Sequence, residues 1–199
     1  MYQQSLMERV FLKIYYLSTT YYFKIIHGIE IGKKCKLSIS ATIRGNITIG
    51  DNVTIGKFTS ITGNITIDNF SHIADFTRIS TMPNAKIEIG QNCLINEFNI
   101  IGSSQKVIIK DYALFGAGVK ITDSTHGIDH VSEIIKRAPI TSEEVVIGRN
   151  CWLGFDVNVI KGGGMGDNCV IGSQSLVNKI LPANVIAVGT PVKVIKERG

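Results

Sequence analysis

An aliphatic residue returns every six positions along most of this 199-residue chain. The first unbroken tract begins at Ile31 and ends at Ile79, and further tracts follow after interruptions. A period of six fits neither an α-helix, with its period of about 3.6, nor an alternating strand, with its period of about 2. It fits a coil of short, flat strands separated by tight turns, with each aliphatic lead residue pointing inward. The sequence therefore predicts an all-β solenoid.

The other positions of the six-residue unit also have a fixed character. The residue after the lead is often Gly, and the fifth residue is small or β-branched. Lead and fifth residues are expected to point into the core, and glycine fits where a corner has no room for a Cβ atom. The lead residues are Ile31, Leu37, Ile43, Ile49, Ile55, Ile61, Ile67, Ile73, Ile79, Ile89, Ile95, Ile101, Ile109, Phe115, Ile121, Ile147, Leu153, Val159, Met165, Ile171 and Val177.

The sixth position, which points outward, changes character along the chain. It is mostly polar up to Arg78 and apolar in many of the later units. We expect these apolar residues to make one face of the later coils apolar, which is typical of a partner or ligand surface. They are Leu94, Ile100, Leu114, Trp152, Val170 and Leu176.

Residues 1–28 lack the repeat and form a segment of their own. Met7, Val10, Phe11, Ile14 and Leu17 recur at helical spacing, so we predict a helix that caps the first coil. The uncharged run 14–23 is too short to span a bilayer, and no signal-peptide layout is present. Contact with a membrane surface through the aromatic residues of this segment is the sharper alternative. Those residues are Tyr15, Tyr16, Tyr21, Tyr22 and Phe23.

Composition and charge agree with a single solenoid domain. Hydrophobic residues make up 44% of the chain, with 20 Gly and only 4 Pro, which is enough apolar material for a continuous core. The net charge of +5 is spread out, so nucleic acid is not indicated as a partner. The cysteines occupy fifth positions without Cys-x-x-Cys spacing, which predicts small buried residues in a reducing, cytoplasmic compartment and no metal site. They are Cys35, Cys93, Cys151 and Cys169.

The largest interruption of the repeat lies between Ile121 and Ile147, and it opens with the sequence Asp-Ser-Thr-His-Gly at 123–127. His126 occupies the sixth, outward position of the last regular unit before a 20-residue loop, 127–146. His72 lies in unbroken repeat and is expected to be an ordinary surface residue. A chain that breaks a regular repeat beside a histidine is expected to place that histidine for a purpose.

These features resemble the hexapeptide-repeat family, whose fold is a left-handed parallel β-helix of triangular cross-section. Three six-residue units make one coil there, which implies about seven coils here. The stretch 107–126, followed by Ile-Gly-Arg-Asn-Cys-Trp-Leu-Gly at 147–154, is similar to galactoside, maltose and polysaccharide O-acetyltransferases. The resemblance covers 31–196 and implies homotrimers with ligand grooves between subunits. The expected organisation is a helical cap at 1–28 and an acyltransferase domain at 29–199, with a C-terminal tail at 183–199.

The resemblance also implies roles for individual residues. His126 corresponds to the general base, and Asn96, thirty residues earlier, faces the same pocket. Trp152 lines the acetyl-CoA site, together with the corner at Gly154, whose backbone N–H groups are expected to hold the oxyanion. Basic residues of the C-terminal run hold the CoA phosphates. These basic residues are Lys179 and Lys193.

One departure from the family pattern concerns the break itself. Many relatives carry Asp-His-x-His-Gly there, whereas Ser124 replaces the first histidine in this chain. His126 is then the base, with His130 as the weaker candidate. The group that orients the imidazole stays open at this point. The candidates are Asp123, Glu97 and Asp129.

The chemistry explains why these residue types are needed. A neutral imidazole can take the proton of a sugar hydroxyl as the oxygen attacks a thioester. No cysteine or serine stands in an obvious nucleophile setting, so direct transfer in a ternary complex is preferred. We therefore expect an acetyl-CoA-dependent O-acetyltransferase that acts on a sugar of a cell-surface polysaccharide or its precursor.

Three other functions are compatible with a solenoid of this kind or share its fold. An N-acetyltransferase for an amino sugar and a non-catalytic binding solenoid both stay open. A zinc carbonic anhydrase of similar fold is rejected, because His72 lies three coils from His126 and the two could not share one metal.

Overall fold

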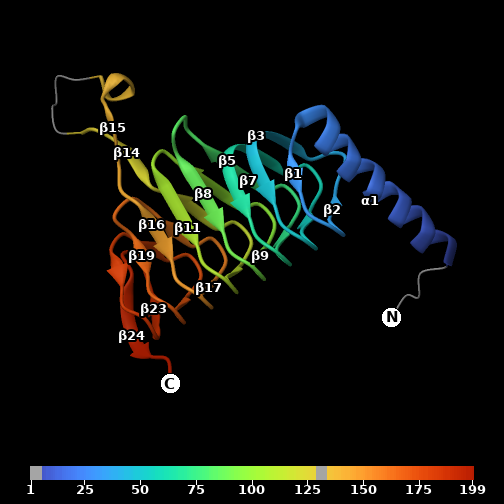
Figure 1. Cartoon of the computed structure of the whole chain (residues 1–199). Helices are drawn as coiled ribbons and strands as arrows, with labels where there is room; N and C mark the ends of the chain where they lie inside the picture. The colour runs from blue at the N-terminus through green and yellow to red at the C-terminus, as the bar shows by residue number, and fades with distance from the viewer. Residues whose placement is uncertain (1–5, 129–133) are drawn as a thin grey trace.

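A computed structural model describes residues 6–128 and 134–199 of the chain. Short parallel strands coil around one axis and form an elongated body, with a helix at one end and a hairpin projecting near the other (Figure 1). The strands stack into three columns, which we call the first, second and third face in the order that the chain visits them from β2 (Lys36–Leu37) onward.

The first face contains β2 (Lys36–Leu37), β4 (Thr54–Ile55), β6 (His72–Ile73), β9 (Leu94–Ile95), β12 (Leu114–Phe115), β17 (Trp152–Leu153), β20 (Val170–Ile171) and β23 (Val185–Val188), with β24 (Lys193–Glu197) antiparallel to β23. The second face contains the first half of β3 (Thr42–Ile49) and of β5 (Ser60–Ile67), then β7 (Arg78–Thr81), β10 (Ile100–Ser103), β13 (Lys120–Thr122), β18 (Asn158–Val159) and β21 (Leu176–Val177). The third face contains β1 (Glu30–Ile31), the second half of β3 and β5, then β8 (Lys86–Ile89), β11 (Lys106–Ile109), β16 (Val145–Ile147), β19 (Gly164–Met165) and β22 (Ile180–Leu181).

The lead residues form the core, as the six-residue period predicted. Ile43, Ile61, Ile79 and Ile101 are register partners in successive coils, and each is at most 1% exposed. A buried side chain of this size contributes roughly 1.5–3 kcal/mol, and each coil buries its leads only against its neighbours. The predicted all-β solenoid is therefore confirmed.

The number of coils is slightly larger than the seven that the hexads indicated. The first face has eight parallel strands within the described residues. The additional coil is formed by β22 and β23, where the core spacing shortens from six residues to four between Val177 and Leu181. Leu181 and Ala187 are buried there and continue the core.

Each interruption of the repeat falls on the same edge of the body. We name the first corner between the first and second faces, the second corner between the second and third, and the third corner between the third and first. Gly45 and Gly63, with φ of +111° and +115°, let β3 and β5 turn the second corner as continuous strands. In later coils additional residues are inserted at this corner after β7, after β10 and after β13, and the insertion after β13 is the longest.

The largest excursion is a hairpin. β14 (Ser124–His126) pairs antiparallel with β15 (Ile140–Ser142), and a short 3-10 helix, η1 (Ile135–Arg137), precedes β15. The hairpin projects from the body in Figure 1. His130 and Asp129 lie outside the described residues.

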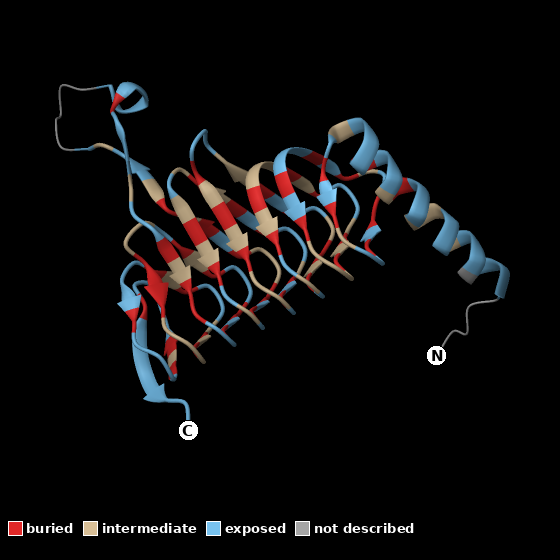
Figure 2. Ribbon diagram, in the orientation of Figure 1, coloured by how far each residue is buried: buried red, intermediate tan, exposed pale blue. Residues whose placement is uncertain are grey.

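Helix α1 (Leu6–His27) covers the first coil with one side only. Phe23 is buried, Thr19 donates a hydrogen bond to the Leu37 carbonyl at 2.8 Å, and the Ile39 N–H donates to the Tyr15 hydroxyl at 3.0 Å. The opposite side of the helix is exposed along its length (Figure 2). None of the helices in the described ranges is long and apolar enough to cross a membrane.

The expectation that the apolar sixth positions share one face is wrong. Leu94, Leu114, Trp152 and Val170 are register partners on the first face and form a continuous outward stripe. Ile100 and Leu176 lie on the second face instead, separated from each other by Lys120 and Asn158. The reason is geometric, because sixth positions belong to the same face only when they are a whole coil apart.

Candidate functional site

The second corner holds His126 at the base of the hairpin. The regular frame of the repeat ends at Thr122, so His126 lies in β14 and pairs with Ile140 instead of continuing the second face. Its side chain is exposed, as the sequence predicted. Among the described residues, no group hydrogen-bonds the imidazole ring. The exposed imidazole is accessible to a substrate or to another subunit.

Asp123 fixes the start of the hairpin. Its carboxylate is fully buried and accepts a hydrogen bond of 2.6 Å from the Ser103 hydroxyl. It also accepts from the backbone N–H groups of Ser104, Gln105 and Lys106 at 2.7–2.9 Å. With both oxygens engaged by the neighbouring coil, Asp123 anchors the hairpin and does not orient His126.

Two lysines lie on the second corner in the coils that follow the hairpin. Lys161 lies between β18 and β19, and its Nζ donates to the Thr141 hydroxyl at 2.9 Å and pairs with Glu143 at 3.4 Å. Lys179 lies one coil farther, between β21 and β22, and is exposed. The histidine and these lysines thus share one edge of the body.

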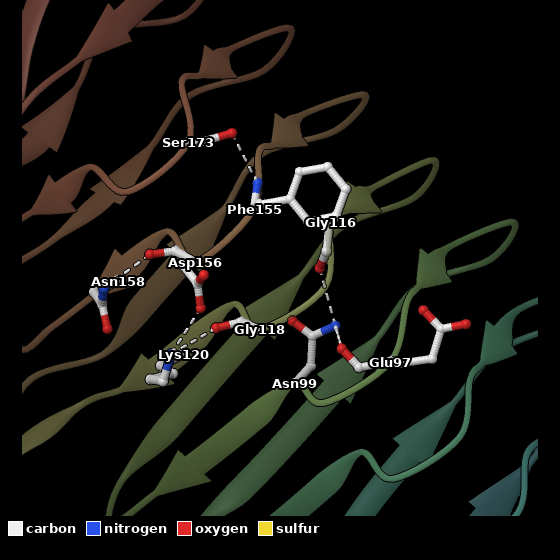
Figure 3. Close-up of polar contacts among 9 residues, drawn as sticks. All are labelled: Glu97, Asn99, Gly116, Gly118, Lys120, Phe155, Asp156, Asn158 and Ser173. Atoms are coloured by element: carbon white, nitrogen blue, oxygen red, sulfur yellow. Dashed lines mark hydrogen bonds and ion pairs between the residues drawn. The ribbon is translucent and has the colours of Figure 1, made fainter.

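The first corner holds Asn96, on the opposite edge of the second face. Its backbone carbonyl accepts hydrogen bonds from the Thr77 hydroxyl at 3.0 Å and from the Asn99 Nδ2 at 2.7 Å. Asn99 is fully buried and also donates to the Gly116 carbonyl at 3.1 Å, which ties two coils together (Figure 3). The buried Asn99 amide fixes the backbone of this corner, where the Asn96 side chain is half-buried.

Gly154 lies on the same first corner, two coils beyond Asn96. A Cβ atom here would lie 2.7 Å from the Ser173 hydroxyl and 2.8 Å from its backbone nitrogen, so only glycine fits. The N–H groups near it are engaged: Gly154 donates to the Ile171 carbonyl at 2.9 Å and Phe155 to the Ser173 hydroxyl at 3.1 Å (Figure 3). The expectation that these groups hold an oxyanion is therefore wrong, because they already bind the next coil.

Trp152 and Lys193 complete the predicted set. Trp152 precedes this corner on the first face, between Leu114 and Val170, and is 51% exposed. Lys193 is exposed at the start of β24, where it pairs with Val188 at the end of β23. Because β23 runs toward the first corner and Lys193 pairs with its last residue, Lys193 lies at the same corner as Asn96 and Gly154.

The predicted site residues therefore divide between two corners of one chain. Asn96, Trp152, Gly154 and Lys193 belong to the first corner or the face beside it, whereas His126 and Lys179 lie on the second corner. A shallow groove of about 460 Å³ on the third face is lined by none of these residues within the described ranges. One chain does not bring the set into one pocket.

The cysteines offer no nucleophile. The described chain holds four free, buried cysteines along the third corner. Burial raises the pKa of Cys93 to about 11 and that of Cys151 to about 12. Both thiols are protonated at neutral pH, and a protonated thiol is a poor nucleophile. No group of three or more His, Cys, Asp or Glu residues suited to a metal ion occurs in the described part of the chain.

The chain is similar in sequence and in structure to known proteins. Residues 28–63 match the family described as bacterial transferase hexapeptide (six repeats). The provisionally named colanic acid biosynthesis acetyltransferase WcaF of Escherichia coli (strain K12) is 36% identical over 129 residues, covering 56% of this chain and 69% of WcaF. The chain belongs to the hexapeptide-repeat transferase family. The galactoside O-acetyltransferase of the same organism is 38% identical over 114 residues, covering 57% of this chain.

The match to some members of the hexapeptide-repeat family is partial. The chain spans 55% of the galactoside O-acetyltransferase and 42% of the acetyltransferase Rv3034c of Mycobacterium tuberculosis. Among solved structures, the N-acyltransferase AntD of Bacillus cereus, in complex with dTDP and coenzyme A, has a TM-score of 0.63 at 21% identity, covering 90% of this chain and 88% of AntD. That likeness shows the shared fold.

Three residues with clear structural roles were missed by the sequence reasoning. Asn99 was detectable, because it puts an amide in a fifth position where small or β-branched residues are usual. Asp123 was considered only as a partner for His126. Lys161 gave no signal, because its contact with Thr141 depends on where the hairpin folds back.

Proposed function

We propose that this protein is an acetyl-CoA-dependent O-acetyltransferase that modifies a sugar hydroxyl. The observation that supports it best is the His126 hairpin, anchored by a buried carboxylate on the edge that also carries Lys161 and Lys179. Relatives of 36% and 38% identity are named acetyltransferases. A chain with this fold, an exposed histidine at the break and a basic edge beside it has the parts that such a reaction needs.

In the proposed reaction, His126 acts as a general base. The imidazole takes the proton from the sugar hydroxyl while the oxygen attacks the thioester carbonyl carbon. The tetrahedral intermediate collapses as the carbon–sulfur bond breaks, and the CoA sulfur receives the proton from the imidazolium. The products are the acetyl ester and free CoA, and His126 returns to its neutral form. General-base assistance of this kind contributes about 10²–10⁴-fold.

Asn96 is the proposed donor to the oxyanion. The backbone N–H groups at Gly154 and Phe155 are engaged, whereas the Asn96 side chain is half-buried at a corner that Asn99 fixes. A side-chain amide can stabilise the negative oxygen as it develops, and such a donor contributes about 10²–10³-fold elsewhere. Direct transfer is favoured over an acyl-enzyme because the buried cysteines are protonated.

The site is proposed to be completed between subunits of a homotrimer. His126 and Lys179 lie on one corner and Asn96, Gly154 and Lys193 on another, so a single chain presents two half-sites. In a cyclic trimer each subunit offers its second corner to the first corner of its neighbour, because the interface is heterologous and closes as a ring. The same arrangement brings Glu97, adjacent to Asn96, toward the imidazole as its orienting carboxylate.

Acetyl-CoA is the proposed acetyl donor, held by residues from both half-sites. Trp152 is half-exposed in an apolar stripe and can cover the pantetheine arm, with Gly154 leaving room for the chain to pass the corner. Lys179 and Lys193 are exposed ammonium groups suited to the phosphates. The acceptor is proposed to be a sugar of a cell-surface polysaccharide or its precursor, modified in the cytoplasm.

Product analysis tests this proposal. Purified protein, acetyl-CoA and a panel of galactosides, glucosides and amino sugars should give an acetyl product whose ester is cleaved by hydroxylamine, with release of free CoA. His126→Ala should lower turnover at least about 100-fold, while the assembly state and acetyl-CoA binding stay unchanged. A hydroxylamine-resistant amide would identify an N-acetyltransferase. No CoA release and no thermal shift with acetyl-CoA would identify a non-catalytic solenoid.

A further inference from the structure

The exposed side of helix α1 is almost entirely apolar. Seven large apolar side chains on it are at least half exposed, and their spacing places them on the side opposite the buried Thr19 and Phe23. They are Met7, Val10, Phe11, Ile14, Leu17, Tyr21 and Ile25. Most of the helix is drawn as exposed in Figure 2. An exposed apolar surface of this extent is rare unless something covers it.

A basic groove runs along one flank of this apolar side. It has a volume of about 630 Å³ between α1 and the first coil, and Leu17 belongs to both the groove and the apolar side. Five lysines line it, and no acidic residue of the ranges 6–128 and 134–199 does. They are Lys13, Lys24, Lys33, Lys34 and Lys36. The groove thus combines apolar walls with five exposed ammonium groups.

Two further observations point to an anionic occupant. The Thr20 hydroxyl lines the groove, is buried, and has no hydrogen-bond partner in the described part of the chain. Residues 6–36 hold six Lys or Arg and two Glu, so they carry +4 of the chain's net charge of +5. A ligand with acceptor oxygens and negative charge would satisfy both the hydroxyl and the lysines.

We propose that α1 docks on the surface of an anionic lipid bilayer. The apolar side lies in the boundary between headgroups and acyl chains, and the groove takes lipid phosphates. The axis of α1 would lie parallel to the membrane plane, because Thr19, Phe23 and Tyr15 hold the opposite side of the helix on the first coil. This combination of a broad apolar side, aromatic residues and flanking lysines is typical of helices that lie on membranes.

The charge complementarity favours lipid over a second copy of this chain. A helix that buried its apolar side against its own copies would bring the lysine-lined grooves of several subunits close together, and like charges repel. An anionic surface instead neutralises each groove. Each lysine near such a surface strengthens binding by about fivefold.

Vesicle co-sedimentation of the full chain tests the proposal. Binding is expected to vesicles containing phosphatidylglycerol and to be weak with phosphatidylcholine alone. Lys13→Ala/Lys24→Ala should weaken binding about 30-fold, and alanine preserves the helix. Lys57→Ala/Lys110→Ala removes the same charge elsewhere and should leave binding unchanged. Ile14→Gln/Leu17→Gln should weaken binding at least about tenfold, whereas Ile180→Gln/Ile195→Gln, at the far end of the body, should not.

Each outcome decides the question. Loss of binding in both helix variants and its retention in both controls would support the proposal. Equal binding to neutral and anionic vesicles, or equal binding by the lysine variant and its control, would overturn it. Absence of vesicle binding together with a smaller assembly for Ile14→Gln/Leu17→Gln would show that another subunit covers the helix, and would also overturn it.

Discussion

A single buried carboxylate, that of Asp123, anchors the hairpin that carries His126, the proposed general base. It accepts one hydroxyl and three backbone N–H groups from the preceding coil, only three residues before His126. A hydrogen bond to a charged acceptor contributes about 1.5–3 kcal/mol to stability. Removing one partner of a buried hydrogen bond costs more than the bond contributes, because the other partner is left unsatisfied. The position of His126, the proposed base, therefore depends on a residue that forms no hydrogen bond with its ring.

Asp123→Asn should reveal this dependence. The substitution turns one acceptor oxygen into an NH₂ group that faces N–H donors, so the free energy of unfolding should fall by about 2–3 kcal/mol and Tm by about 5–10 °C. Turnover should fall as well, because the hairpin is no longer anchored. Asp156→Asn is the matched control, since Asp156 is exposed and pairs with Lys120 at 3.3 Å. Its Tm should change by less than about 3 °C, and equal losses in the two variants would contradict the anchoring role.

Trp152 is the residue that can report on the acetyl donor directly. It is the only tryptophan of the chain and is 51% exposed. If CoA covers it, saturating acetyl-CoA should change the emission spectrum, and Trp152→Ala should weaken acetyl-CoA binding while Tm changes little. Leu94→Ala, at the other end of the same stripe, serves as control and should bind acetyl-CoA normally. An unchanged spectrum at saturation would count against a place for Trp152 in the donor site.

At the scale of elements, the third corner is built as a column of small side chains. Cys93, Ala113, Cys151 and Cys169 follow one another in successive coils, and each is at most 1% exposed. The Cys151 thiol donates to the Gly166 carbonyl at 3.2 Å. Desolvation raises the pKa of Cys151 from 9.0 to about 12, so this thiol stays neutral at pH values where it would ionise in the unfolded chain.

The Cys151 thiol makes the free energy of unfolding depend on pH in the alkaline range. Below about pH 9 both states hold the proton, and the stabilisation from the neutral thiol is fully present. As the pH rises from there toward 12, only the unfolded state loses the proton, so the free energy of unfolding falls. Cys151→Ala places at this position the residue type that Ala113 has one coil earlier. The Tm of this variant should fall less over this pH range than the Tm of the wild type. Identical pH profiles for the two proteins would show that Cys151 is not responsible.

The sequence determined these elements to different degrees. The core column could be predicted residue by residue, because a lead residue every six positions has to face inward whichever coil it belongs to. The division of the outward residues between faces follows from the same count, because consecutive six-residue units lie on consecutive faces, so Leu94 and Ile100 do not share one. The role of Asp123 was hidden, because its partners are set by the path of the neighbouring coil.

The candidate site could be predicted only as a set of residues. The break at Ile121 pointed to His126, and the resemblance added Asn96, Trp152 and the lysines. The placement on two corners follows from the order of the strands: Asn96 comes after a strand of the first face and His126 after a strand of the second. A linear pattern does not reveal which corner faces a neighbouring subunit.

At the scale of the whole molecule, the division of the site predicts how subunits depend on one another. His126→Ala and Asn96→Ala should each be nearly inactive as pure assemblies. In mixed trimers, a subunit with an intact His126 can lie beside a neighbour with an intact Asn96. With equal amounts of the two chains, about one site in four of the unselected mixture then carries both groups, because each site of the proposed trimer takes one corner from each of two subunits.

Co-expression of these two variants with different affinity tags, followed by purification through both tags, is the most direct test of this account. Acetyl transfer per trimer should recover to about a third of the wild-type rate, because every trimer that carries both tags has one intact site of three, while each variant alone stays at least about 100-fold below it. Recovery of activity would place the base and the amide on adjacent subunits. Mixed trimers that stay as inactive as the single variants would contradict a site shared between subunits.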